Sequence, residues 1–176
     1  MFESAELGHR IDKATYDKEV PLLRDPFRLD TEAVIAAGRG SKIVFVCSPN
    51  NPTGNLVDEV EMLKVCRELA HTSLVCVDEA YIEFAGRTSL ASRLGEFPNL
   101  VLLRTLSKAY ALAGARLGTL IASEEIVGLL KRIIPPYAIP ESTVEDVLRL
   151  TEAPQRASSA ARIRTHVNPT GIAAAQ

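Results

Sequence analysis

Residues 42–55 read KIVFVCSPNNPTGN, and this stretch decides the fold class. Its first part, KIVFVC (42–47), is a nearly continuous apolar run rich in β-branched side chains, as in a strand that is buried on both faces. The second part, SPNNPTGN (48–55), is rich in proline, asparagine and glycine, which favour a turn over continued extension. The stretch therefore predicts a buried strand that enters a tight loop.

The flanking residues continue an alternation of strands and helices. Directly downstream, VDEVEMLKVCRELAHT (57–72) has apolar residues near helical spacing and acidic residues in its first turn. The other expected elements are strands at 20–23, 74–77, 100–103 and 118–122, helices at 30–37, 123–133 and 142–150, and a loop with a short helical piece at 78–98. Ser123 is expected to cap one helix, and Ser142 with Glu145 forms a capping-box pattern for the last. We therefore predict an α/β fold with a mainly parallel sheet and flanking helices.

The length of the chain, 176 residues, suits one domain with a single core. We expect residues 1–152 to form this domain. The remaining residues, 153–176, are rich in Ala, Ser and Arg and have no sustained apolar period. This composition predicts a loosely ordered C-terminal tail.

Composition and charge exclude several classes of protein. The chain has 20 Lys and Arg against 22 Asp and Glu, a net charge of −2, so it lacks the broad positive field that attracts nucleic acid or an acidic membrane. Its 47% hydrophobic and 24% charged residues are typical of a globular chain. No apolar run approaches the roughly 20 residues of a membrane-spanning helix, and the first residues lack the pattern of a secretion signal. We expect a cytoplasmic protein.

The cysteines and histidines point to no disulfide framework or metal site. Cys47, Cys66 and Cys76 are odd in number, form no CxxC pair and lie in apolar stretches, so each is expected to be a small buried hydrophobe. The three histidines are scattered without the spacing of metal ligands.

Polar residues follow three of the expected strands. Asn51 follows the first, Asp78 the second and Lys108 the third. In a parallel sheet, ligands bind in the crevice beyond the carboxyl ends of the strands, where these three side chains would converge. An amide, a carboxylate and an amine do not make a protease triad, and the sequence lacks the GxxxxGK[ST] phosphate loop. The set fits a site that forms an imine.

The chemistry of such a site assigns roles to Lys108 and Asp78. A lysine that condenses with a carbonyl must be partly neutral, and Arg116, eight residues further on, supplies a neighbouring cation that favours the neutral form. An electron-withdrawing pyridine cofactor needs an anion beside its ring nitrogen, and Asp78 emerges from a buried strand to provide it.

The remaining polar groups suit the other parts of the same cofactor. Tyr81 and Asn51 can hydrogen-bond a ring oxygen, while Thr105, Ser107 and the guanidinium of Arg116 can hold a phosphate. Together these residues predict a site for pyridoxal 5′-phosphate. Glu79 and Glu83 flank the site and are expected to be solvated surface charges.

Three segments resemble a known family in sequence, order and spacing. SPNNPTG (48–54), VDEAYIEF (77–84) and LRTLSKAYALAGARLG (103–118) resemble the fold-type-I pyridoxal-phosphate-dependent aminotransferases, and most of all the histidinol-phosphate aminotransferases. The resemblance runs from about residue 20 to residue 150. It implies that this chain is part of the large, cofactor-binding domain of such an enzyme.

The resemblance also implies roles for individual residues. Lys108 would carry the Schiff base with the cofactor, Asp78 would pair with the pyridine nitrogen, and Asn51 and Tyr81 would contact the ring oxygen. Thr105, Ser107 and Arg116 would correspond to phosphate contacts. In this family, the stretch corresponding to IPPYAIPES (134–142) reaches toward the active site of the second subunit of a homodimer, which makes Tyr137 a candidate contact across the dimer.

The activity implied by the resemblance is transamination between histidinol phosphate and 2-oxoglutarate, in histidine biosynthesis. A threonine-phosphate decarboxylase and an aromatic aminotransferase share these core motifs and stay open as alternatives. Members of the family also carry an upstream phosphate-binding loop, an aromatic residue that stacks on the cofactor ring and a downstream substrate-binding arginine, none of which is identifiable here. A non-catalytic fragment is therefore a third alternative.

Overall fold

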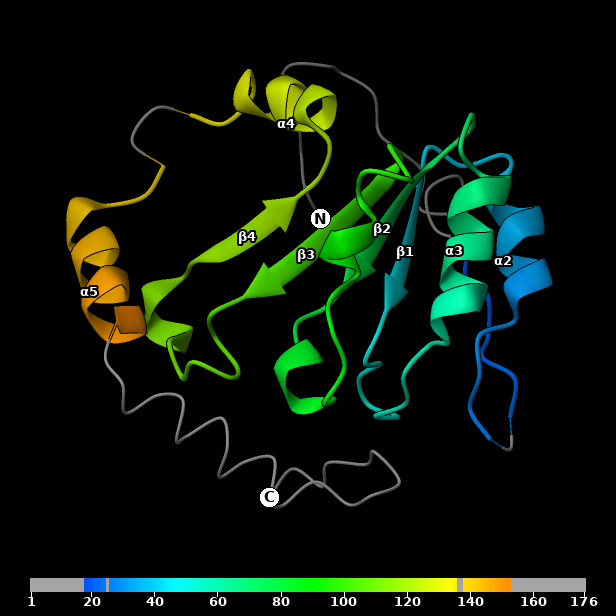
Figure 1. Cartoon of the computed structure of the whole chain (residues 1–176), viewed down its shortest axis with the longest axis horizontal. Coiled ribbons are helices and arrows are strands. Elements are labelled where there is room, and N and C mark those ends of the chain that lie inside the picture. The colour runs from blue at the N-terminus through cyan, green and yellow to red at the C-terminus, as the bar shows by residue number, and fades with distance from the viewer. Residues whose placement is uncertain (1–17, 25, 136–137, 153–176) are drawn as a thin grey trace.

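The computed structural model describes residues 18–24, 26–135 and 138–152, which form a four-stranded sheet with helices (Figure 1). The strands are β1 (Ile43–Cys47), β2 (Leu74–Asp78), β3 (Leu100–Thr105) and β4 (Gly118–Ile121). The helices are α2 (Thr31–Gly38), α3 (Glu59–Glu68), α4 (Glu124–Lys131) and α5 (Glu141–Glu152), with 3₁₀ turns η1 (Ile82–Phe84), η2 (Leu90–Arg93) and η3 (Ala113–Ala115). The predicted α/β class is confirmed.

The strands follow one another in the order β1-β2-β3-β4. The pairs β1–β2 and β2–β3 are parallel, and β4 returns antiparallel to β3, so the prediction of a mainly parallel sheet is confirmed. The register pairs Cys47 with Asp78, and Asp78 with Leu103. This register brings the carboxyl ends of the three parallel strands to one level.

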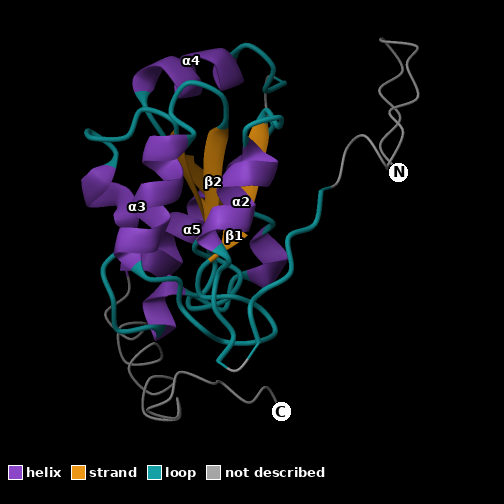
Figure 2. Cartoon of the chain, turned by 90° about the vertical axis from the view of Figure 1, so that its right-hand side faces the viewer, coloured by secondary structure: helices purple, strands orange, loops and turns teal. Residues whose placement is uncertain are grey.

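One face of the sheet packs against α2 and α3, which lie in front of the strands in Figure 2. Successive side chains of a strand point to opposite faces, so every second residue of β1, β2 and β3 enters this core. Burying each such aliphatic side chain contributes about 1.5–3 kcal/mol. The residues of the strands and of these two helices in the core are Val34, Ile35, Val46, Met62, Leu63, Val65, Cys66, Val75, Val77, Leu100 and Leu102.

Helix α3 begins at a capping residue that the acidic start of 57–72 suggests. The carboxylate of Asp58 accepts a hydrogen bond from the backbone N–H of Val60 at 2.8 Å. On the exposed side, Glu59 pairs with Arg93 at 3.6 Å. The helix ends at Glu68, before the predicted residue 72, because the chain turns at Leu69 to enter β2.

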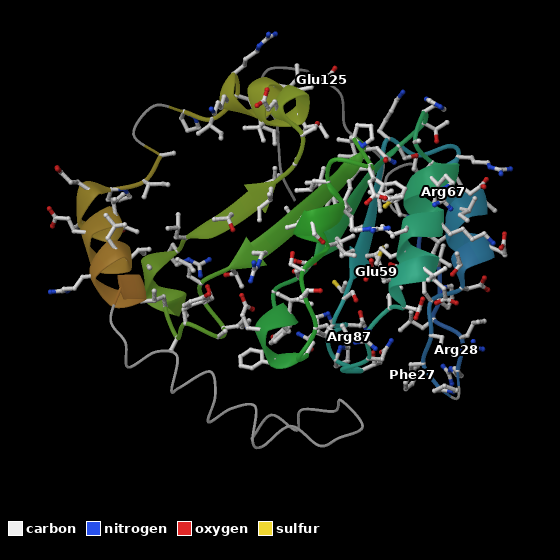
Figure 3. The ribbon with its side chains drawn as sticks, viewed as in Figure 1. Phe27, Arg28, Glu59, Arg67, Arg87 and Glu125 are labelled. Carbon is white, nitrogen blue, oxygen red and sulfur yellow. The ribbon has the colours of Figure 1, made fainter. Side chains whose placement is uncertain are left out.

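The surface of α3 also carries a cation–π contact. Arg67, labelled in Figure 3, places its guanidinium carbon 5.8 Å from the centroid of the Phe97 ring. Phe97 is buried, so this contact joins the surface of α3 to the chain that leads into β3.

The first strand does not have the two buried faces that its apolar sequence predicts. Val46 is buried against the helices, but Ile43 and Phe45 on the opposite face are 45% and 68% exposed. The prediction was wrong because, among the described residues, helices cover only the face of β1 that carries Val46.

The strand predicted at 20–23 is also wrong, because Leu23 forms only an isolated bridge with Arg28. Pro21 has no N–H to donate to a neighbouring strand, which disfavours a longer ladder.

The boundaries of the last helices depart from the prediction. The carbonyl of Pro140 accepts from the backbone N–H groups of Thr143 and Val144, so α5 starts at Glu141 and Ser142 lies inside it. The predicted capping box at Ser142 was therefore wrong. Ser123 is at the expected N-cap of α4, but its hydroxyl makes no capping hydrogen bond.

Helix α5 lies beyond β4, at the opposite side of the molecule from α2 (Figure 1). Within the described ranges, no helix combines the length and apolarity needed to cross a bilayer.

Candidate functional site

The site is built where β1, β2 and β3 end. At this level the backbone N–H of Ser48 donates to the carbonyl of Asp78 at 3.0 Å, and that of Glu79 donates to the carbonyl of Leu103 at 2.8 Å. These bonds extend the parallel ladder just past the strand ends. The loops that carry Asn51 and Lys108 therefore leave the sheet beside the end of β2, where Asp78 lies.

The loop that carries Asn51 is braced by its own polar groups. The carbonyl of Asn55 accepts from Asn50 N–H at 2.8 Å, and that of Asn50 accepts from Gly54 N–H at 2.7 Å. Gly54 has φ 71°, a left-handed conformation that glycine adopts without steric cost. The Asn51 side chain is exposed at the tip of this loop.

Asp78, the last residue of β2, is half-buried and held through both carboxylate oxygens. Oδ1 accepts from the backbone N–H of Ala80 at 2.9 Å. Oδ2 faces the thiol of Cys47, with Sγ 3.9 Å away. Desolvation raises the pKa of the Cys47 thiol, and the charge and hydrogen bond of Asp78 raise it further.

Cys47 itself was predicted to be buried, and this prediction was wrong. Cys47 is exposed because it lies on the same open face of β1 as Ile43 and Phe45, whereas Cys66 and Cys76 are buried as predicted. Its contact with Asp78 was missed, although both residues lie at the ends of strands predicted for one sheet.

The structure brings Lys108 and Tyr81 together. The amine Nζ of Lys108 lies 5.4 Å from the centroid of the Tyr81 ring, in a cation–π arrangement. The Tyr81 ring is half-buried and leans on Phe84, with their centroids 6.3 Å apart. Tyr81 follows Asp78 by three residues, so the carboxylate, the phenol and the amine belong to one small region.

The proposed phosphate contacts lie in or beside the loop between β3 and β4. The hydroxyl of Thr105 accepts from the backbone N–H of Ser107 at 3.1 Å. Arg116 is exposed, and its Nη1 donates to the carbonyl of Ala113 at 3.4 Å. Its backbone is left-handed, with φ 51°, which is uncommon outside glycine.

The same loop is closed by two internal hydrogen bonds. Leu106 N–H donates to the carbonyl of Leu117 at 3.4 Å, and Leu112 N–H donates to that of Leu106 at 3.0 Å. These bonds, with the pairing of Thr105 and Gly118, close a loop that contains Ser107, Lys108 and Arg116. Tyr137 lies outside the described residues.

Two acidic residues beside the site differ from their prediction as solvated surface charges. Glu79 is 2% exposed, and its carboxylate accepts from Ser89 Oγ at 2.6 Å and from the backbone N–H of Leu90 at 2.9 Å. Glu83 is partly buried and pairs with Arg104. The alternation of side chains along a strand could have predicted the burial of Glu79, because it follows Asp78 directly and so points to the opposite face of the sheet.

Comparisons with known proteins agree with this geometry. Residues 8–170 match the family described as aminotransferase class I and II, which depends on pyridoxal phosphate. The chain is 44% identical over 138 residues to histidinol-phosphate aminotransferase 2 of Mannheimia succiniciproducens, covering 78% of this chain and 39% of that protein. It is 49% identical over 129 residues to histidinol-phosphate aminotransferase 1 of Legionella pneumophila, covering 72% and 35%.

A solved structure gives the same result. The histidinol-phosphate aminotransferase of Sinorhizobium meliloti, in complex with pyridoxal 5′-phosphate, superposes with a TM-score of 0.69 at 25% identity, over 84% of this chain and 40% of that one. The chain spans about two fifths of the length of the curated relatives it matches. Because the family match covers most of the chain, we conclude that it belongs to the class I and II aminotransferases.

Proposed function

We propose that this chain is the cofactor-binding part of a histidinol-phosphate aminotransferase that uses 2-oxoglutarate as the amino acceptor. The observation that carries the proposal is that the Lys108 amine lies over the ring of Tyr81. Tyr81 follows Asp78, the last residue of β2, by three residues. The names of the relatives, at 44% and 49% identity, support the choice of substrate.

The residues present fit pyridoxal phosphate by the chemistry of their donors. Lys108 offers an exposed primary amine for the aldehyde, and Asp78 offers a carboxylate whose Oδ2 faces a weak donor, the thiol of Cys47. Tyr81 and Asn51 can donate hydrogen bonds to the ring oxygen. The guanidinium of Arg116 and the hydroxyls of Thr105 and Ser107 can donate hydrogen bonds to a phosphate dianion. Ser107 and Arg116 lie in the closed loop between β3 and β4, and Thr105 lies where this loop begins.

These residues divide the work of amino transfer. When bound, pyridoxal phosphate supplies an electron sink for the carbon that carries the amino group. Nζ of Lys108 holds the cofactor and then moves a proton on and off the reacting carbon. The Asp78 carboxylate holds a proton on the ring nitrogen, and the Tyr81 hydroxyl orients the ring through its oxygen.

The wider organisation belongs to the same proposal. We assign residues 1–152 to part of the large domain, and the predicted C-terminal tail, residues 153–176, lies outside the described residues. The enzyme works in the cytoplasm as a homodimer, in which Tyr137 contacts the site of the second subunit. Its substrates are small amino and oxo compounds, which is the substrate class of the family.

Covalent trapping tests the assignment of Lys108. The chain is incubated with pyridoxal phosphate, reduced with borohydride and digested, and the modified peptide is identified by mass spectrometry. We expect modification at Lys108 and at least about a tenfold loss of adduct in Lys108→Ala. Lys131→Ala removes an exposed lysine of α4 and serves as the matched control, with unchanged yield. An adduct of undiminished yield in Lys108→Ala would refute the assignment.

A second assay tests the substrate. With cofactor present, we expect the chain to form glutamate from 2-oxoglutarate only when histidinol phosphate is added. Release of carbon dioxide from threonine phosphate would instead favour the decarboxylase, and glutamate formation from aromatic amino acids would favour the aromatic aminotransferase. An adduct at Lys108 without any amino transfer would favour a non-catalytic binding module.

A further inference from the structure

The strand pairing gives Asp78 a neighbour that the proposed function does not use. Cys47 and Asp78 are register partners at the ends of β1 and β2, so their side chains lie on the same face of the sheet. The thiol Sγ is 3.9 Å from Oδ2, while Ala80 N–H holds Oδ1 at 2.9 Å. The Asp78 carboxylate is thus contacted at each oxygen by a different donor.

The backbone fixes this geometry. Ser48 N–H donates to the carbonyl of Asp78 at 3.0 Å, so the residue after Cys47 is tied to the Asp78 backbone. The thiol therefore cannot shift along β1 unless the hydrogen bonds between β1 and β2 break. The backbone N–H of Ala80 and the thiol of Cys47 therefore contact different oxygens of the Asp78 carboxylate and restrict the rotation of this group about its side-chain bond.

We propose that Cys47 is a positioning residue for Asp78, whose thiol orients the carboxylate toward the ring nitrogen of pyridoxal phosphate. The proposal rests on the proposed function, because it assigns Cys47 a role only through Asp78. A thiol suits this role because it is a weak donor that stays protonated beside an anion. The raised pKa of Cys47 is consistent with this, since both burial and Asp78 favour its neutral form.

Thiol alkylation tests the contact in the chain without cofactor. Cys47 is the exposed cysteine, whereas Cys66 and Cys76 are buried, so iodoacetamide on the folded chain reports mainly on Cys47. The thiolate is the reactive form, and Asp78→Asn removes the charge that opposes it. We expect Asp78→Asn to be alkylated at least about threefold faster at pH 8, with the rate profile shifted to lower pH.

The matched control is Glu125→Gln. Glu125 also carries one negative charge, but it lies on α4 at the other end of the sheet from the β1 carboxyl end (Figure 3). Its alkylation profile should equal that of the wild type. Equal profiles for Asp78→Asn and Glu125→Gln, with both variants folded by circular dichroism, would overturn the proposal.

A pair of substitutions at Cys47 separates hydrogen bonding from packing. Cys47→Ser keeps a donor on the same carbon, while Cys47→Val keeps apolar bulk and strand preference but has no donor. In a fluorescence titration with pyridoxal phosphate, we expect Cys47→Val to bind about three- to tenfold more weakly than the wild type. Cys47→Ser should recover most of this loss. Wild-type affinity in Cys47→Val, or a loss in both variants alike, would overturn the positioning role.

The two experiments separate this proposal from the proposed function. If the wild type takes no cofactor at Lys108, the proposed function fails and the positioning role fails with it, whatever the alkylation profiles show. If the wild type takes cofactor at Lys108 but the two Cys47 variants bind it equally well, the function stands and the positioning role alone is refuted.

Discussion

Cys66, on α3, is fully buried, and burial raises the pKa of its thiol from 9.0 to about 11. Burial favours the neutral thiol over the thiolate. The resulting contribution to the unfolding free energy is fully present below pH 9.0 and is lost as the pH rises through about 11. We expect the wild type to lose about 2 kcal/mol more unfolding free energy than Cys66→Ala between about pH 8 and pH 10.5. Urea unfolding at each pH measures this difference. Parallel losses in the two proteins would contradict it.

At the same scale, the site residues were predictable to the extent that they end strands. Apolar runs fix where Asp78 leaves the sheet, and the spacing of the motifs brings Lys108 near Tyr81. The burial of Glu79 was not predictable from its charge, because its partners, Ser89 and Leu90, come from a loop ten residues away or more. Local sequence does not say which polar group a distant loop will offer.

At the scale of elements, the N-caps of α3 and α4 make a matched pair. Asp58 bonds Val60 N–H with its side chain, whereas Ser123 at the corresponding position of α4 makes no such bond. We expect Asp58→Ala to lower the unfolding free energy by about 1 kcal/mol. Ser123→Ala should lower it by no more than about 0.3 kcal/mol. Chemical unfolding of the two variants measures both, and equal costs would contradict the assigned caps.

Elements were predicted better in type than in their ends and direction. The helical spacing of 57–72 identified α3, and the apolar runs identified all four strands of the described sheet. Whether β4 runs parallel or antiparallel to β3 was not in its sequence, because the loop before it can return in either direction. The start of α5 was missed because a backbone carbonyl, that of Pro140, meets its first N–H groups, rather than the predicted hydroxyl of Ser142.

At the scale of the whole molecule, β1 has one covered and one open face. Val46 is buried against the helices, and its neighbour Phe45 is 68% exposed on an edge strand. We expect Val46→Thr to cost about 1–3 kcal/mol, because it buries a hydroxyl. Phe45→Thr should change unfolding free energy by no more than about 0.5 kcal/mol while reducing self-association in sedimentation experiments. An equal cost for the two variants would mean that Phe45 is covered in solution.

The open face also marks the limit of prediction at this scale. A run such as IVFVC is equally compatible with a central strand and with an edge strand. Its hydrophobicity shows that its side chains can be buried, but not which segments pack beside it. The alternation of strands and helices predicted a mainly parallel sheet, but which strand lacks a neighbour on one side depends on residues that a single run does not contain.

The closed loop between β3 and β4 ties together two groups that sequence distance would separate. The ends of the loop are joined by the hydrogen bond from Leu106 N–H to the Leu117 carbonyl, beside the paired residues Thr105 and Gly118. The amine at position 108 and the guanidinium at position 116 are therefore mounted on one tethered segment and share its thermal motion. Breaking this hydrogen bond would therefore displace the proposed anchor of the aldehyde and the proposed phosphate contact together.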